Sequence, residues 1–483
     1  MTTITRQGNL AGNHHPPRRS FLRARYDAAQ TTEENRRHWA AADGLSPDAS
    51  LNSEVRQVLR NRCRYEVANN SYAKGIGLTI ANDTISTGPM LQLIELDKAT
   101  KKVVETLFWE WAQEIGLADK LRQMRFARFD SGEAFTIFRT NPGLMHPIKL
   151  DLQIVEGEQI ADPSFESIVN PNVVDGIYYD DFGNPISYRK LRKHPGSHAW
   201  LILPTEYDDI PARFVWHYFR SDRPGQCRGI PDITPAIQLF AELRRYCAAV
   251  IAAAETAADF AAVLQSDAPP TDEEDVSEEV AAFDTVELAK RMGTVLPGGY
   301  KLGQLEAEQP TTTYPDFVDA KLKEIARCLC VPFHIASMDP KSANMSSSYV
   351  VGQLYVQERI VDRSVFDMLL DKAFASWLSE ARLIPNFLPE LPDLVPHEWF
   401  WPGLGHHADP QKVANATTTD LSSGITNIPR EHARRGLDWE EQQELAAKSL
   451  GVSVDEYREM IRNKLFGPQQ PQESQKIEEN TDE

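Results

Sequence analysis

The stretch RFVWHYFRSDRPGQCRGIP, residues 213–231, decides the fold because it joins a strand to a long helix. Its first part is a run of β-forming side chains. Its second part, Arg220–Gly229, is charged and contains proline and glycine, which is typical of a loop. Pro231 and Pro235 suit the first turn of a helix, where an amide hydrogen is spare. The alanine-rich sequence that follows predicts a helix from Pro235 to about Leu264.

On the N-terminal side of this join, the sequence predicts an α+β unit. Residues 32–73 have a helical pattern, and Gly75 and Gly77 predict a turn into a strand at Leu78–Ile80. Residues 120–220 are rich in strand patterns, with hairpins expected at Ala134–Arg139 and Gly176–Leu191. One amphipathic helix is expected over Asp97–Ile115, ending at Gly116, with packing anchors at Leu107, Trp109, Trp111 and Ile115.

On the C-terminal side, long helices alternate with polar segments. Tyr314–Val331 carries one apolar stripe at spacings of four, three and four, formed by Val318, Leu322, Ile325 and Leu329. Ser337–Ser348 is polar and predicts a loop, and a helix of roughly 50 Å is expected from Ser347 to Arg382. The remainder to Leu465 predicts shorter helices, with breaks at Gly424, Pro429 and Gly436.

The overall charge of this 483-residue chain limits its function. The formal net charge is −19, which argues against a free-standing nucleic-acid binder, because such proteins use excess Lys and Arg to displace counterions from phosphates. Two explanations fit this negative charge: it keeps the protein soluble, or it forms a channel wall that weakly repels passing DNA. Composition does not distinguish between them. No apolar run approaches the roughly 20 residues that a membrane helix needs.

Motifs for metal binding and catalysis are incomplete. The five cysteines are scattered, and Cys328 and Cys330 lack a partner pair, which favours free thiols in the core over a zinc site. His14–His15 and His406–His407 lack further ligands at zinc spacing. The sequence has no GxxxxGK[ST], HExxH or GxSxG motif. We therefore expect no catalytic residue, no metal and no cofactor, although acidic residues could still assemble a two-metal nuclease site in space.

The segment HYFRSDRPGQCRGIPDITPAI closely resembles the corresponding stretch of lambda-type portal proteins of tailed bacteriophages. Six other blocks resemble that family in the same order, so that the resemblance covers roughly residues 20–460: RNRCRYEVANNSYAKGIG, FARFDSGEAFTIF, LDLQIVEGEQIADP, DGIYYDDFGNPISY, SMDPKSANMSSS and HADPQKVANATTTDLSSGITNIPREHARRGLD. Their collinear order makes the resemblance specific.

The resemblance implies an α+β portal fold that assembles into a ring. Its parts would be a basic flexible arm (1–25), an α+β wing (26–234), a first stem helix (235–264), a clip (265–312), a second stem helix (313–332), a tunnel loop (333–349), a long wing helix with a return segment (350–400), a helical crown (401–466) and a disordered tail (467–483).

Three sets of site residues follow from this resemblance. A tunnel loop facing DNA would present Lys341, Ser342, Asn344, Met345 and Ser346. Basic residues off the apolar stripe of the second stem helix, where they either line the channel or face water, are Lys321, Lys323 and Arg327. An acidic exposed loop in the clip, placed to meet the packaging motor, contains Asp272, Glu273, Glu274 and Asp275.

The implied function is a portal: a channel at one capsid vertex through which double-stranded DNA is packaged and later ejected. The implied partners are eleven further copies in a dodecameric ring, double-stranded DNA bound without sequence preference, the terminase large subunit, a head-completion or connector protein, and the major capsid or scaffold protein. The protein is expected to be soluble in the host cytoplasm before it enters the virion. The alternatives are a metal-dependent DNA-processing enzyme and a capsid scaffold or interaction protein that does not contact DNA.

Overall fold

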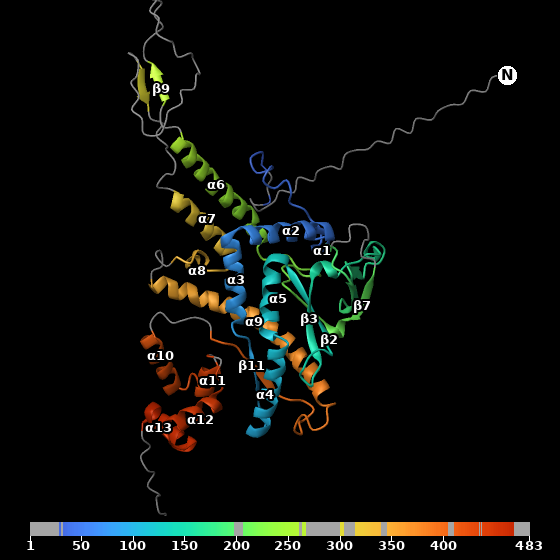
Figure 1. Ribbon diagram of the computed structural model, residues 1–483, viewed down its shortest axis with the longest axis vertical. Helices are drawn as coiled ribbons and strands as arrows, with labels where there is room; N and C mark the ends of the chain where they lie inside the picture. The colour runs from blue at the N-terminus through green and yellow to red at the C-terminus, as the bar shows by residue number, and fades with distance from the viewer. Residues whose placement is uncertain are drawn as a thin grey trace, which may run out of the picture.

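The computed structural model describes residues 29, 32–197, 206–259, 263–266, 300–303, 314–339, 345–403, 410–433, 435 and 437–467. Helices and small antiparallel sheets alternate along the chain (Figure 1). The expected α+β class is confirmed. Among the described residues, none of the helices combines the length and apolarity needed to span a bilayer.

Five helices form the N-terminal part: α1 (Pro47–Ser50), α2 (Ser53–Asn69), α3 (Ser71–Ile85), α4 (Lys98–Glu114) and α5 (Leu117–Ser131). Side-chain oxygens of Asn52, Asn70 and Asp97 accept hydrogen bonds from first-turn amides of α2, α3 and α4, as helix N-caps do. The predicted end of the helix at Gly116 is confirmed, because Gly116 adopts the left-handed conformation that closes α4.

The predicted strand at Leu78–Ile80 is wrong, because α3 continues through it to Ile85. The glycines that suggested a turn have a packing role instead. A Cβ atom on Gly77 would lie 2.6 Å from the ring of Phe129 on α5, so glycine allows the two helices to approach closely. Two further expectations fail nearby: Trp109 is exposed while Phe108 and Trp111 fill the core, and residues 120–131 belong to α5 rather than to a strand.

Two antiparallel sheets follow α5. The first has the order β3-β2-β8, with β2 (Glu133–Thr140), β3 (Leu150–Glu156) and β8 (Val215–Phe219). The second has the order β4-β5-β6-β7, with β4 (Val173–Val174), β5 (Ile177–Tyr179), β6 (Pro185–Leu191) and β7 (Tyr207–Pro211). The predicted hairpin within Gly176–Leu191 is confirmed, with residues 180–184 forming its turn.

The predicted join at residues 213–237 is confirmed: a strand is followed by a loop and then by a helix. After β8 and a loop, the chain enters a short 3₁₀ turn (Thr234–Ala236) and then α6 (Ile237–Asp259). The predicted end of this helix near Leu264 is wrong, because Leu264 lies in β9 (Val263–Ser266), which pairs with β10 (Tyr300–Gly303). Most of the expected clip, residues 267–299 and 304–312, lies outside the described residues.

The next helices are α7 (Tyr314–Cys328), the short α8 (Phe333–Ser337) and α9 (Met345–Ala381). The predicted stripe on α7 is confirmed, since Leu322, Ile325 and Leu329 are buried and Val318 packs beside them against α3 and α6. Residues Met345 and Ser346, expected in a loop, are the first residues of α9. At 1.5 Å per residue, the 37 residues of α9 extend about 55 Å across the molecule (Figure 1).

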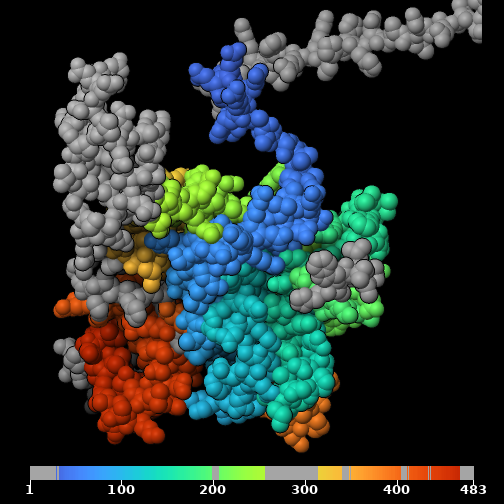
Figure 2. All heavy atoms as spheres, turned by 45° about the horizontal axis from the view of Figure 1, so that its top comes forward, coloured from blue at the N-terminus to red at the C-terminus, as the bar shows by residue number. Residues whose placement is uncertain are grey.

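The C-terminal helices are α10 (Pro410–Ser422), α11 (Ile428–Ala433), α12 (Trp439–Leu450) and α13 (Val454–Phe466). Figure 2 shows them as a separate lobe beside the N-terminal helices. Strand β11 (His397–Phe400), which pairs with β1 (Met90–Leu93), leads from α9 toward this lobe. The expected break at Pro429 is wrong, because proline lies in the first turn of α11, where its missing amide hydrogen costs nothing.

Candidate functional site

The join between β8 and α6 is held by a buried cluster centred on Glu133, at the start of β2. Its carboxylate accepts hydrogen bonds from Arg60 Nη2 at 2.6 Å, Arg228 Nη2 at 2.7 Å and His217 Nε2 at 2.9 Å. The backbone amide of Gly229 donates a further hydrogen bond at 3.0 Å. We call these residues, namely Glu133, Arg60, Arg228 and His217, the Glu133 cluster.

Arg228 connects the Glu133 cluster to three chain segments at once. Besides Glu133, its guanidinium donates to the carbonyl oxygens of Gly157, Ile160 and Asp175 at 2.9, 3.3 and 2.8 Å. Its side chain is 1% exposed, so these carbonyls replace water almost completely. Arg228 and Gly229, from the stretch 213–231, therefore clamp these chain segments together within the subunit.

Gly229 is required by a close crossing of two backbones. A Cβ atom at Gly229 would lie 2.2 Å from the carbonyl oxygen of Gly132, which itself has a φ of +90°. No side chain fits between backbone atoms at that distance. The glycines in DSGEAF and QCRGIP are therefore explained by one contact.

Charges in the Glu133 cluster support one another. Burial alone would raise the pKa of Glu133, but Arg228, His217 and Arg60 outweigh burial and hold its pKa well below the usual range. Burial lowers the pKa of His217, so the neutral imidazole donates from Nε2 to the Glu133 carboxylate. The cluster thus holds an ionised carboxylate between two guanidinium groups.

A second buried cluster connects α5 to α9 and to the start of the α6 segment. Asp362 on α9 accepts from Arg125 Nε and Arg128 Nη1, each at 2.9 Å, and lies 3.1 Å from Arg359 Nη1. Asp232 pairs with Arg125 at 3.1 Å and with Arg128 at 3.3 Å. We call these five residues, namely Arg125, Arg128, Asp232, Arg359 and Asp362, the Asp362 cluster.

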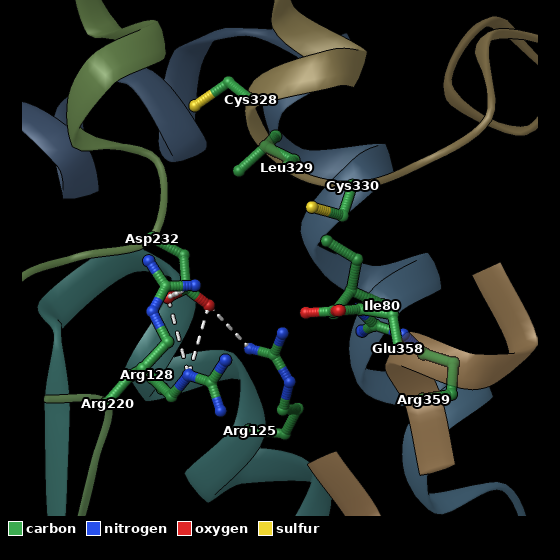
Figure 3. Close-up of a pocket in the computed structure, with 10 residues that line it drawn as sticks. All are labelled: Ile80, Arg125, Arg128, Arg220, Asp232, Cys328, Leu329, Cys330, Glu358 and Arg359. Carbon is green, nitrogen blue, oxygen red and sulfur yellow. Dashed lines mark hydrogen bonds and ion pairs between the residues drawn. The ribbon is translucent and has the colours of Figure 1, made fainter. Parts of the chain in front are cut away.

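A hollow opens beside the Asp362 cluster, and Figure 3 shows its lining. It is small and partly open to solvent. The lining comes from α3, α5, the loop after β8, the end of α7 and α9: Ile80, Arg125, Arg128, Arg220, Asp232, Cys328, Leu329, Cys330, Glu358 and Arg359. The wall is therefore dominated by guanidinium groups.

The expectation that the cysteines are core thiols is met only by Cys63, which is buried on α2. Cys330 is exposed, and it has a positive φ of +53° at the end of the α7 segment. Cys227, Cys247 and Cys328 are half-buried. Sequence spacing did not reveal that Cys328 and Cys330 border a hollow.

One cluster among the described residues has the composition of a cation site: Glu156, Glu158 and His194. Arg64 lies 3.6 Å from Glu156 and 2.7 Å from Glu158, so both carboxylates already face a cation. The amide of Gly196 donates to His194 Nδ1 at 3.0 Å, which leaves the proton of the neutral ring on Nε2, 2.9 Å from Glu156. Arg64 therefore already pairs with both carboxylates, whereas His194 Nε2 forms no hydrogen bond to the described residues despite its short distance to Glu156.

The structure separates the predicted site residues. Lys321 on α7 pairs with Glu242 of α6 at 3.1 Å, so it helps to join these two helices. Lys323 lies over the ring of Phe333 at 4.9 Å and, like Arg327, is exposed. Residues Lys341, Ser342 and Asn344 lie outside the described residues, as do the four acidic residues Asp272, Glu273, Glu274 and Asp275.

The long helix α9 is apolar on two opposite sides. Its inner side is buried by Phe366, Leu370, Phe374 and Trp377. Its outer side carries Val350, Leu354, Val361 and Met368, which are 58, 69, 54 and 59% exposed. The last three are spaced by seven residues, so they fall on one line along the helix.

These features define a class of protein: a subunit in which most buried arginines form ion pairs with carboxylates of the same chain, and whose longest described helix has an exposed apolar side. Comparison with known proteins gives the family. The model for "Phage portal protein, lambda family" matches residues 33–351, and the chain belongs to this family. The family is structural, and its members are parts of the phage capsid.

A curated relative and several solved structures are similar to this chain. The "Probable portal protein" of Halomonas phage phiHAP-1 is 23% identical over 408 residues, which cover 79% of this chain and 78% of that protein. A chain from the neck of an empty GTA particle, computed with C6 symmetry, has a TM-score of 0.47 at 13% identity and covers 82% of this chain and 94% of its own. A chain from the native neck, computed with C12 symmetry, has a TM-score of 0.44 at 12% identity, with coverages of 80% and 94%.

Proposed function

We propose that copies of this portal protein close into a ring around a channel that passes double-stranded DNA at one capsid vertex. The observation that carries this proposal is the uncovered apolar side of α9. Apolar side chains that are exposed together along one side of a helix mark a surface that another chain can cover, and the inner side of α9 is already covered by its own chain. A neighbouring copy in a head-to-tail contact would cover the outer side, and such contacts close into rings.

Within this ring, we assign α6 and α7 to the stem. The two helices pack through Lys321 and Glu242 and through the rings of Tyr246 and Phe317, whose centroids are 4.1 Å apart. Residues 265–312 between them would form the clip, residues 338–344 between α8 and α9 the tunnel loop, and α10–α13 the crown. This order of parts follows from family membership and from the observed helices.

DNA would be contacted through its phosphates, without base recognition. A moving duplex presents every sequence register to the same side chains, so base-specific contacts would hinder translocation. Lys323 and Arg327 are exposed on α7 and are available for transient phosphate contacts, while the net charge of −19 keeps the duplex from binding tightly. Lys341 and Asn344 of the tunnel loop would add contacts at the narrowest point.

The partners in this proposal are those of a packaging machine. Twelve copies would form the ring, and the acidic clip segment Asp272–Asp275 would meet the terminase large subunit and, later, the head-completion or connector protein. The outer part of the ring would contact the major capsid or scaffold protein. Each of these contacts is a proposal from family membership, and the contact between copies has additional support from α9.

We expect the double variant Leu354→Glu with Val361→Glu to lose ring formation while each subunit stays folded. Two buried carboxylates would face an apolar partner in the ring, but only water in the isolated subunit. Negative-stain electron microscopy and native mass spectrometry measure the assembly, and far-UV circular dichroism checks the fold. Val103→Glu, at an exposed valine of α4, is the matched control. Rings of normal size in the double variant would refute the assigned interface.

A variant of the tunnel loop tests the DNA path. Replacing Lys341 and Asn344 with alanine is expected to leave ring formation intact and to reduce DNA packaging or retention, because polar loop side chains contribute little to a core. The measurement is the amount of DNase-protected DNA in particles assembled with this variant. Loss of folding or assembly would contradict the loop assignment, and so would normal packaging.

A further inference from the structure

We propose that the hollow between α5, α7 and α9 binds a phosphate-type oxyanion. Four guanidinium groups line it, from Arg125, Arg128, Arg220 and Arg359 (Figure 3). Three of these arginines are at least 96% buried, so water does not screen their charge as it does on a surface. All of these groups belong to one subunit, so the hollow exists with or without a ring.

Unused donors remain in the hollow. The hydrogen bonds of Arg125 and Arg128 use Nε and Nη1, which leaves Nη2 of each guanidinium without a hydrogen bond to the described residues. Arg359 uses Nη1 toward Thr84 and Asp362, and its Nε is buried without a hydrogen-bond partner among the described residues. A fully buried N–H without an acceptor is unfavourable, and an oxyanion in the hollow would offer acceptors to the guanidinium groups that line it.

The buried charges are also unequal. The Asp362 cluster contains three arginines and two aspartates, so three minus two leaves one positive charge. At the rim, Arg220 is paired with Asp222 at 2.7 Å, so that this pair adds no net charge, and Arg220 also lies 3.4 Å from Asp232 of the cluster. An incoming anion would neutralise the remaining guanidinium, and the planar fork of arginine suits the tetrahedral oxygens of phosphate.

Two carboxylates line the hollow: Asp232 is paired with Arg125 and Arg128, whereas Glu358 opposes the incoming anion. Its side chain lies on the opposite wall, and its carboxylate points into the hollow (Figure 3). Glu358 forms no ion pair with the described residues. The next residue of α9, Arg359, is by contrast paired with Asp362. Removing the charge of Glu358 is therefore expected to strengthen binding, whereas removing Arg220 is expected to weaken it.

An anion here would join three parts of the subunit. The end of α7 contributes Leu329 and Cys330, α5 contributes Arg125 and Arg128, and α9 contributes Arg359. Binding to the folded state alone raises its stability, so a bound oxyanion would brace the base of the stem against the long helix. The source is either free inorganic phosphate or a phosphate of nucleic acid, since both present the same oxygens.

The test is thermal unfolding of the full-length protein in increasing inorganic phosphate, with sodium chloride adjusted to constant ionic strength. We expect the melting temperature to rise with phosphate but not with the added chloride. Glu358→Gln is expected to lower the half-saturating phosphate concentration roughly fivefold, and Arg220→Gln to raise it by a similar factor, as an effect of one nearby charge. Arg192→Gln, at an exposed arginine paired with Asp208, is the matched control and is expected to respond like wild type.

Line broadening of the phosphorus-31 resonance gives a second readout that does not depend on unfolding. Broadening by the wild-type protein that decreases in Arg220→Gln supports the site. A short DNA duplex identifies the source: if it restores the narrow line, nucleic-acid phosphate competes for the hollow, and if it does not, free phosphate is the ligand. Equal responses of wild type and both hollow variants would overturn the proposal, even if the protein forms rings.

Discussion

Replacing Glu133 with alanine is expected to lower the free energy of unfolding by about 3–5 kcal/mol, because it removes the fully buried carboxylate that Arg60 and Arg228 share. Only the more exposed carboxylates of Glu158, 3.6 Å from Arg60, and Asp175, 3.1 Å from Arg228, would then remain as counter-charges. That loss is comparable to a large part of the total stability of a typical domain. The carboxylate has no exposed surface, so water does not replace it. Urea unfolding followed by tryptophan fluorescence measures the effect.

Two further variants serve as comparisons for the stability of Glu133→Ala. Glu133→Gln keeps the size of the side chain and one carbonyl acceptor, so its cost is expected to be smaller than that of alanine. Glu459→Gln removes an exposed carboxylate that lies 3.8 Å from Arg462, and it is expected to change stability by less than about 1 kcal/mol. If Glu133→Ala is as stable as Glu459→Gln, the clamp at the β8–α6 join does not hold the fold.

Replacing Asp362 with asparagine is expected to destabilise the protein by about 3–5 kcal/mol at neutral pH, since the amide places N–H groups against Arg125, Arg128 and Arg359. Asp362 joins α9 to α5, so the loss would weaken the attachment of the long helix to the rest of the subunit. The measurement is the free energy of unfolding of wild type and variant in urea.

The pH dependence of that difference gives a second check. Burial alone would raise the pKa of Asp362, but Arg125, Arg128 and Arg359 outweigh burial and lower its pKa to about 2. A carboxyl group with a depressed pKa stabilises the fold above its unfolded pKa and loses that effect as the pH falls through its folded pKa. The difference between wild type and Asp362→Asn is therefore expected to shrink by about 2 kcal/mol between pH 5 and pH 2. A difference that stays constant over this range would contradict the assigned charge of Asp362.

Much of the element order was predictable from sequence, because it depends on local signals. The strand-loop-helix join at residues 213–237, the cap and stop of α4, and the apolar stripe of α7 each use proline, glycine or periodicity in a short window. The strand predicted at Leu78–Ile80 failed because Gly77 serves a contact with Phe129, which is 52 positions away in sequence. A local pattern contains no information about such a contact.

The buried arginines were not recognised from sequence, although a signal existed. Arg56 and Arg60 on α2, Arg125 and Arg128 on α5, and Arg359 and Arg363 on α9 repeat at spacings of three or four residues. That spacing places each pair on one face of its helix, together with buried apolar side chains. Charged residues are usually exposed, so this pattern alone favoured solvent-facing helix surfaces. Most of their partners come from distant parts of the chain: Glu133 for Arg60, Asp175 for Arg56, and Asp232 and Asp362 for Arg125 and Arg128.

The proposed function requires identical subunits arranged around one axis. The most direct measurement is an electron cryomicroscopy map of the purified full-length protein in which α9 and residues 337–348 are traced. We expect a closed ring with an axial hole wide enough for a DNA duplex, with residues 337–348 nearest the axis and Leu354, Val361 and Met368 covered by a neighbouring copy. A monomer, or a ring with these residues at its outer edge, would contradict the account.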